Sequence, residues 1–306
     1  MILRAEELTR DYSTGFLRRG RHRALDHVSF DLAKGEVFGL LGPNGAGKST
    51  TLKLLTGLLA PTSGRVWING LDPRQPSARA RLGFLPDQPH FYQHLTGREL
   101  LLYFAGLCGV SPRDQTTRVE GLLADVGLAS DASRLIREYS KGMVQRLGLA
   151  QALINDPDVL LLDEPMSGLD PAGRRDVRAL ILDWRDRGRT VLFSSHILTD
   201  AEQLCSRVAI LHRGRVVAQG AVSTLTEGRR RGWEVEASDL TPAAVASLES
   251  PLHHARRIAH GRYSFELGSG TLPEAFVARV AAAGGRLERV TPTRASLEDV
   301  FLEHVS

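Results

Sequence analysis

The chain has 306 residues, a length that is typical of two domains and permits a sizeable hydrophobic core. Hydrophobic residues make up 42% of it and charged residues 24%, which is too apolar a composition for a disordered chain. The net charge of +4 is too small to indicate a nucleic-acid partner, and no uncharged apolar stretch reaches the ~18 residues that a membrane-spanning helix needs.

Apolar runs alternate with helical patterns through residues 1–220, and this alternation predicts an α/β domain with a mainly parallel sheet. Strands are expected at 36–41, 65–69, 81–86, 159–163 and 190–194, followed by a hairpin of two strands at 207–212 and 215–219. Helices are expected at 48–59 and 171–187, and a largely helical subdomain is expected at about 88–155.

The character of the sequence changes after Gly220. The charged, glycine-bounded segment 227–232 indicates a boundary, which divides the chain into a domain of residues 1–222 and a smaller domain of residues 223–306. In the smaller domain we expect strands and helices in the order β-α-β-β-α-β. This order is typical of the split βαβ arrangement of ferredoxin-like domains, so a small α+β domain is predicted at the C-terminus.

The most specific motif is a glycine-rich loop of the form G-x-x-x-x-G-K-[ST], placed between a predicted strand and a predicted helix. Glycines let backbone N–H groups turn inward around phosphate oxygens, and the N-terminus of the following helix adds partial positive charge. In such a loop Lys48 reaches the β and γ phosphates of a nucleotide, and Ser49 offers its hydroxyl to Mg²⁺. The residues expected to bind ATP phosphates are Gly42, Pro43, Asn44, Gly45, Ala46, Gly47, Lys48, Ser49 and Thr50.

The apolar strand expected at 159–163 ends in two acids, Asp163 and Glu164. Strand ends at the carboxyl edge of an open α/β sheet face the ligand crevice, so Asp163 can hold Mg²⁺ through its water shell. A carboxylate beside it that is not needed on the metal can orient or deprotonate an attacking water. We therefore predict a metal-side role for Asp163 and a general-base role for Glu164.

Three further segments indicate which class of phosphate-loop protein this is. Tyr-Ser-Lys-Gly-Met-Val-Gln-Arg at 139–146 precedes the acidic strand, Ser-Gly-Leu-Asp at 167–170 follows it, and His196 stands after the strand expected at 190–194. In this order the motifs of residues 1–220 resemble the ATP-binding subunit of ABC transporters, a class of P-loop NTPases. The resemblance implies a signature loop that contacts the ATP held by the opposite protomer, formed by Ser140, Lys141, Gly142 and Met143.

The resemblance also implies roles for single residues. Asp170 belongs to the loop that links the two ATP sites, and His196 contacts the γ-phosphate as a second catalytic residue. Tyr12 fits the position of the aromatic that stacks on adenine, and Phe16 is a rival for that role.

This chain departs from the family's pattern in two places. The usual signature Leu-Ser-Gly-Gly-Gln is here Tyr-Ser-Lys-Gly-Met, which keeps the serine and the second glycine. The family's glutamine that senses Mg²⁺ and the permease is replaced by Asp87, and Gln88 follows one residue later. The metal-side residue is therefore Asp87 or Gln88, and the Leu-Pro spacing before it favours Asp87.

By the resemblance, two subunits sandwich two Mg-ATP molecules head to tail, as a homodimer or with a related ATPase subunit. ATP closes the pair and its hydrolysis releases it. The chain would then act as a peripheral protein at the cytoplasmic face of the cell membrane and drive a separate permease, docked near residues 87–106. Residues 295–302 resemble the tail of ABC-2 exporter subunits, which favours export.

Two other functions stay open. A soluble ABC ATPase acting on ribosomes or DNA usually has two cassettes or long heptad arms, and this sequence has one cassette and no such arm. An importer ATPase could instead use residues 223–306 as a regulatory domain that senses a small molecule.

Overall fold

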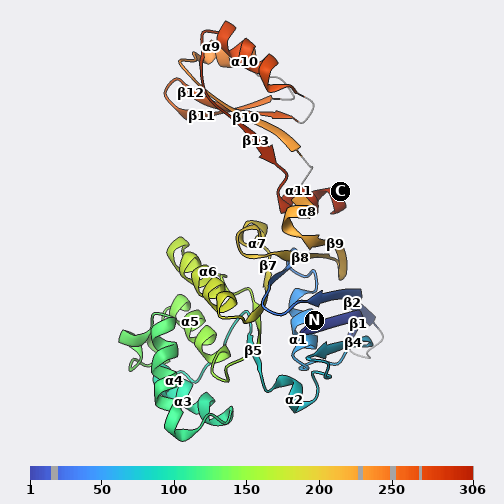
Figure 1. Ribbon diagram of the computed structural model, residues 1–306, viewed down its shortest axis with the longest axis vertical. Coiled ribbons are helices and arrows are strands. Elements are labelled where there is room, and N and C mark those ends of the chain that lie inside the picture. The colour runs from blue at the N-terminus through green and yellow to red at the C-terminus, as the bar shows by residue number, and fades with distance from the viewer. Residues whose placement is uncertain (15–19, 227–229, 249–252, 269–270, 306) are drawn as a thin grey trace. The chain divides into compact units, whose positions relative to one another are not determined.

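The computed structural model describes the chain except for residues 15–19, 227–229, 249–252, 269–270 and 306. The chain forms two compact units, one of Met1–Val222 together with Glu303–Ser306 and one of Ser223–Leu302 (Figure 1). The last four residues thus group with the first unit, although the sequence analysis places them in the second.

A six-stranded sheet forms the centre of the first unit, in the order β5-β6-β7-β3-β8-β9. All neighbours are parallel except β8 and β9, which form an antiparallel hairpin. Every residue of β3, β6 and β7 is buried, as expected for continuous apolar strands in a parallel sheet. The predicted α/β fold is confirmed. The strands are β3 (Val37–Leu41), β5 (Leu82–Leu85), β6 (Val159–Asp163), β7 (Thr190–Ser195), β8 (Arg207–His212) and β9 (Arg215–Ala221).

An antiparallel sheet in the same unit has the order β2-β1-β4, with β1 at Leu3–Thr14, β2 at Gly20–Leu32 and β4 at Ser63–Ile68. It shares a hydrophobic core with the central sheet, in which the rings of Phe30 and Phe38 stack at 5.6 Å between centroids. The sequence analysis predicted only β4. The β1–β2 pairing shifts register repeatedly, and Glu7 and His27 have positive φ, so the two-residue alternation that marks a strand is interrupted.

The helices of the first unit follow the predicted order with some changes at their ends. Helix α1 ends at Leu55, earlier than expected, because Gly57 has a φ of 73° and turns the chain out of the helix. The sequence analysis missed α7, which follows β7. The helices outside the helical group described next are α1 (Lys48–Leu55), α2 (Pro76–Arg79), α6 (Pro171–Asp186) and α7 (Leu198–Leu204). Helix α8 (Val222–Thr226) contains the boundary between the two units.

Three helices lie together beside the central sheet, within the segment 88–155 where a helical subdomain is expected (Figure 1). A capping box of Thr96 and Glu99 fixes the start of α3, and Pro112 begins α4. Among the described residues, no helix is both long and apolar enough to cross a membrane. The group contains α3 (Gly97–Leu107), α4 (Pro112–Asp125), α5 (Lys141–Ala152) and the short turns η1 (Ala129–Asp131) and η2 (Ile136–Glu138).

The second unit holds a four-stranded antiparallel sheet in the order β11-β12-β10-β13. The first βαβ unit is β10-α9-β11, and β12 lies between its two strands. The second unit is β12-α10-β13, and β10 lies between its two strands, so each unit is split by a strand of the other. A core around Val235, Phe265 and Phe276 joins the sheet to the two helices. The elements are β10 (Arg230–Ser238), α9 (Pro242–Leu248), β11 (His253–Ala259), β12 (Arg262–Gly268), α10 (Pro273–Ala282) and β13 (Arg286–Arg294), followed by α11 (Leu297–Val305), whose last three residues group with the first unit.

Candidate active site

The glycine-rich loop connects the end of β3 to the start of α1. Gly42 has a φ of 146°, and a Cβ there would lie 2.2 Å from the backbone oxygen of Leu211. Gly47 has a φ of 110°, and a Cβ there would lie 2.5 Å from Leu25 Cδ2. Both positions therefore require glycine. Gly47 is also the N-cap of α1 and supplies no side-chain cap, which leaves the first N–H groups of the helix for an anion.

Lys48 is buried at the start of α1, with 6% of its side chain exposed. Its Nζ donates to the backbone oxygens of Gly42 at 2.7 Å and Pro43 at 3.3 Å. Nζ also lies 3.2 Å from Glu164 Oε1, an ion-pair separation without hydrogen-bond geometry. These partners compensate the burial of the ammonium group and hold it between the loop and the carboxylate.

Asp163 ends β6 and is 3% exposed. Its Oδ1 accepts a hydrogen bond from Ser194 Oγ on the neighbouring strand β7 at 2.6 Å. Burial raises the pKa of Asp163, while hydrogen bonds from Ser194 and Ser49 lower it. The nearby charges of Asp87 and Glu164 raise the same pKa further. A cation bound beside this carboxylate would therefore favour its ionised form.

Glu164 follows Asp163 and has a φ of 49°, a left-handed conformation that costs a non-glycine residue about 1 kcal/mol. Its N–H donates to Ser194 Oγ at 2.9 Å, so one buried hydroxyl holds both acidic residues. Its Oε2 lies 2.9 Å from Nδ1 of His196. A carboxylate held between a lysine and a histidine beside the phosphate loop is placed to accept a proton from a water molecule.

Residues 44–50 of the loop and Glu164 line one cavity of about 310 Å³, whereas Asp163, Ser194 and His196 are absent from its described lining. Among the described residues, Asp87 lines the cavity and Gln88 does not, and the metal-side role of either residue stays a prediction. Tyr12 lines it from β1, whereas its rival Phe16 lies outside the described residues. The described lining consists of Tyr12, His22, Ala24, residues 44–50, Asp87 and Glu164.

The signature loop and the linking loop contact each other. Ser140 caps α5, where its Oγ accepts from the N–H of Met143 at 3.3 Å, and Asp170 caps α6, where its Oδ1 accepts from the N–H of Gly173 at 2.9 Å. The side chain of Leu169 lies beside Gly142, and that of Lys141 lies beside Gly168. In the described lining of the cavity, no residue of 140–143 or 167–170 is present, so one chain does not bring these loops to its own phosphate loop.

Sequence reasoning missed Ser194 and His22. The sequence signal for Ser194 was a polar residue inside the apolar run of β7, and its contact with the acidic strand depends on the pairing of β6 with β7. His22 pairs with Tyr12 across β1 and β2, and it could not be found without that hairpin.

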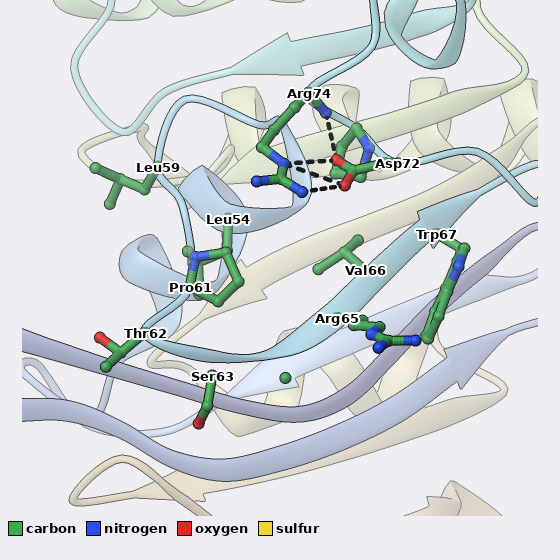
Figure 2. Close-up of a pocket in the computed structure, with 12 residues that line it drawn as sticks. Leu54, Leu59, Pro61, Thr62, Ser63, Arg65, Val66, Trp67, Asp72 and Arg74 are labelled. Carbon is green, nitrogen blue, oxygen red and sulfur yellow. Dashed lines mark hydrogen bonds and ion pairs between the residues drawn. The ribbon is translucent and has the colours of Figure 1, made fainter.

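Another cavity, of about 290 Å³, lies against β4 (Figure 2). Leu54, Val66 and Trp67 line it, together with Asp72 and Arg74. The two charged residues bind each other, and hydrogen bonds from Arg74 lower the pKa of Asp72 to about 2. Its described lining contains no predicted site residue.

Known proteins are similar to this chain in sequence and in fold. The family model described as ABC transporter matches residues 25–167. An uncharacterized ABC transporter ATP-binding protein of Synechocystis sp. is 38% identical over 99% of this chain and 84% of its own length. The fluoroquinolones export ATP-binding protein of Mycobacterium tuberculosis is 39% identical over 92% of this chain and 87% of its own. The bacitracin transport ATP-binding protein BcrA of Bacillus licheniformis is 34% identical over 99% and 96%.

Solved structures of ABC transporter cassettes are similar to this chain in fold. The ATP binding subunit of an ABC transporter has a TM-score of 0.65 at 32% identity and covers 74% of this chain and 92% of its own. A dimeric ATP-binding cassette in a post-hydrolysis state with ADP and Pi has a TM-score of 0.66 at 25% identity, with coverage of 72% and 98%. The resemblance seen in the motifs is thereby confirmed, and the chain belongs to the ABC transporter family as an ATP-binding subunit with ATPase activity.

Proposed function

We propose that this chain hydrolyses Mg-ATP as the ATPase subunit of an ABC-2 type export system and drives a separate membrane permease. The observation that carries the catalytic part is the position of Glu164, 3.2 Å from Lys48 Nζ and 2.9 Å from His196 Nδ1 at the phosphate loop. Export is supported by relatives named for the export of fluoroquinolones and of Nod factor, which match 92% of this chain.

The chemistry follows from these contacts. Phosphate oxygens would take the N–H groups at the start of α1 and compete with Glu164 for the ammonium of Lys48. The carboxylate released in this way accepts a proton from water while His196 stays on its other oxygen. The hydroxide attacks the γ-phosphorus, the bond from that phosphorus to the β-γ bridging oxygen breaks, and ADP and phosphate result.

The residues at the loop fit Mg²⁺ as the cofactor. A buried carboxylate and a hydroxyl, from Asp163 and Ser49, are oxygen ligands of the kind that Mg²⁺ prefers, with Asp87 close by. In the described part of the chain, no group of three His, Cys, Asp or Glu side chains could hold a metal without other ligands, so the ion would bind together with phosphate oxygens. When bound, Mg²⁺ neutralises charge on the phosphates.

A head-to-tail dimer explains why the signature loop stays apart from the phosphate loop of its own chain. In such a dimer Ser140 and Gly142 of one subunit complete the site of the other. The dimeric solved cassette with ADP and Pi supports this arrangement.

The segment proposed to meet the permease carries exposed aromatic side chains. Tyr92 is 55% and Tyr103 48% exposed, and their rings contact edge to face at 6.2 Å between centroids. Exposed aromatic side chains are typical anchors of protein interfaces. The segment begins at Asp87, which lines the nucleotide cavity, so docking and the ATP site would be coupled through a few residues.

Glu164→Gln tests the catalytic part. The variant should elute as a dimer with Mg-ATP in size-exclusion chromatography and lose about 10²- to 10⁴-fold in turnover, because the water loses its base while the phosphate contacts stay. Lys48→Ala, the control, should bind no ATP and stay monomeric. Monomeric Glu164→Gln in Mg-ATP would contradict the proposal, and failure of the chain to co-purify with a multispanning membrane protein would contradict the part that concerns a permease.

A further inference from the structure

Tyr12 does not stand alone at the nucleotide cavity. The guanidinium carbon of Arg10 lies 4.8 Å from the centroid of the Tyr12 ring, a cation–π contact within β1. In the described lining of the cavity, Tyr12 is present and Arg10 is absent. We therefore expect the guanidinium to lie over the face of the ring that points away from the cavity, which leaves the other face for a ligand.

Arg10 is itself fixed by the protein. Its Nη1 donates to the backbone oxygen of Ala60 at 2.7 Å, in the segment that follows α1. Its Nε is buried and has no hydrogen-bond partner within the described part of the chain. Native structures rarely leave a buried donor unpaired, so the position of this guanidinium is not set by hydrogen bonding alone. Within the described part of the chain, the other interaction of this guanidinium is with the face of Tyr12.

The same segment ties β1 to the phosphate-binding helix. The N–H of Thr62 donates to the backbone oxygen of Thr9 at 2.8 Å, and the N–H of Asp11 donates to Thr62 Oγ1 at 3.0 Å. These bonds flank Arg10 on both sides in the sequence. The strand that carries Tyr12 is thus held at a fixed place relative to the end of α1, whose start forms the phosphate site.

We propose that Arg10 is a positioning residue that holds the Tyr12 ring as a rigid platform for the base of the nucleotide. It would strengthen binding of the base without contacting it, because a ring fixed in advance loses less freedom when the ligand binds. The inference rests on the proposed function, since it assumes that a nucleotide occupies the cavity.

The chain offers a matched control on the same strand. Arg4 lies over the ring of Trp67, with 6.0 Å from its guanidinium carbon to the ring centroid. Trp67 lines the cavity against β4 shown in Figure 2 rather than the nucleotide cavity. Arg4→Met therefore removes an arginine–aromatic contact from β1 at a distance from the nucleotide.

The test compares two ligands of the full-length chain by titration, Mg-ATP and Mg-bound inorganic triphosphate, which has no base. Arg10→Met should weaken ATP binding by about 3- to 30-fold, the range expected for a cation–π contact, and leave triphosphate binding unchanged. Arg10→Lys keeps the cation and should recover most of the ATP affinity. Arg4→Met should change neither ligand.

Three results would overturn the inference: unchanged ATP affinity, equal weakening of both ligands, or tighter ATP binding, which would mean that the guanidinium covers the base side of the ring. If Arg10→Met fails to fold, Arg10→Gln, which also removes the cation, and Tyr12→Leu replace it. Their combined loss of ATP affinity should be less than additive, and additive losses would equally contradict the inference. Failure of the unmodified chain to bind either ligand would instead refute the proposed function.

Discussion

Ser194→Ala is the most direct test of the electrostatics of the site. The hydroxyl of this fully buried residue donates to Asp163 Oδ1 at 2.6 Å and accepts from the N–H of Glu164 at 2.9 Å. The substitution removes both hydrogen bonds and leaves a methyl group in their place.

The loss follows from the two broken bonds. A hydrogen bond to a charged group contributes about 1.5–3 kcal/mol, and a buried N–H left without a partner costs about 1–3 kcal/mol. The two effects share one hydroxyl, so we expect the free energy of unfolding to fall by about 3 kcal/mol near pH 8. For a unit of this size that lowers the melting temperature by roughly 6–12 °C.

The stability lost in Ser194→Ala should depend on pH. Burial raises the pKa of Asp163 above 3.8, so between pH 3.8 and the raised pKa the folded state binds more protons than the unfolded state. Stability therefore falls as pH rises through this window. The Ser194 hydrogen bond lowers that pKa, so its removal widens the window. Ser194→Ala should thus cost least below pH 3.8 and most above the raised pKa.

Thermal and urea unfolding at about pH 4 and about pH 8 would measure this difference. Ser195→Ala is the control, because Ser195 Oγ bonds only to the backbone of Ile197 among the described contacts. Its loss should not change with pH. A pH-independent loss for Ser194→Ala, equal to that of Ser195→Ala, would refute the reasoning.

Two further predictions concern the loop and the metal side. Gly47→Ala should destabilise the chain by about 2–3 kcal/mol in urea unfolding and abolish ATP binding, because its Cβ would meet Leu25 at 2.5 Å. Gly45→Ala meets no atom within 4 Å and should cost only about 1 kcal/mol of backbone strain; equal losses would contradict this account. Asp87→Ala should raise the Mg²⁺ concentration needed for half-maximal ATPase activity, whereas Gln88→Ala should not, and the opposite result would assign the role to Gln88.

The central sheet was predictable because its strands are nearly continuous apolar runs. The strand expected at 159–163 is β6 without change; Asp163 ends it and Glu164 follows directly. The glycine-rich loop was equally predictable from the sequence, since its residue types are set by backbone conformation and by phosphate chemistry. Local sequence determines both features, so no tertiary contact was needed to find them.

What could not be predicted depends on contacts between distant segments. The β1–β2 hairpin is irregular, and its shifted register conceals the alternation that would reveal it. Because the hairpin was not predicted, the place of His22 opposite Tyr12 and the stacking of Arg10 on Tyr12 were not predicted either. Ser194 acts only because β7 lies beside β6, a neighbour relation that the order of the strands in the chain does not specify.

The charges around the cavity explain why the nucleotide and its metal should bind together. The buried carboxylate of Asp163 lies close to two other acidic side chains. The charges of Asp87 and Glu164 both raise the pKa of Asp163. Lys48 is a single cation, and its nearest carboxylate is Glu164. A triphosphate that entered without a metal would add several negative charges to this set, and the repulsion would act at low dielectric. A divalent cation beside Asp163 removes this repulsion and favours the ionised carboxylate, so ATP affinity should depend steeply on Mg²⁺ while Lys48 selects the phosphates.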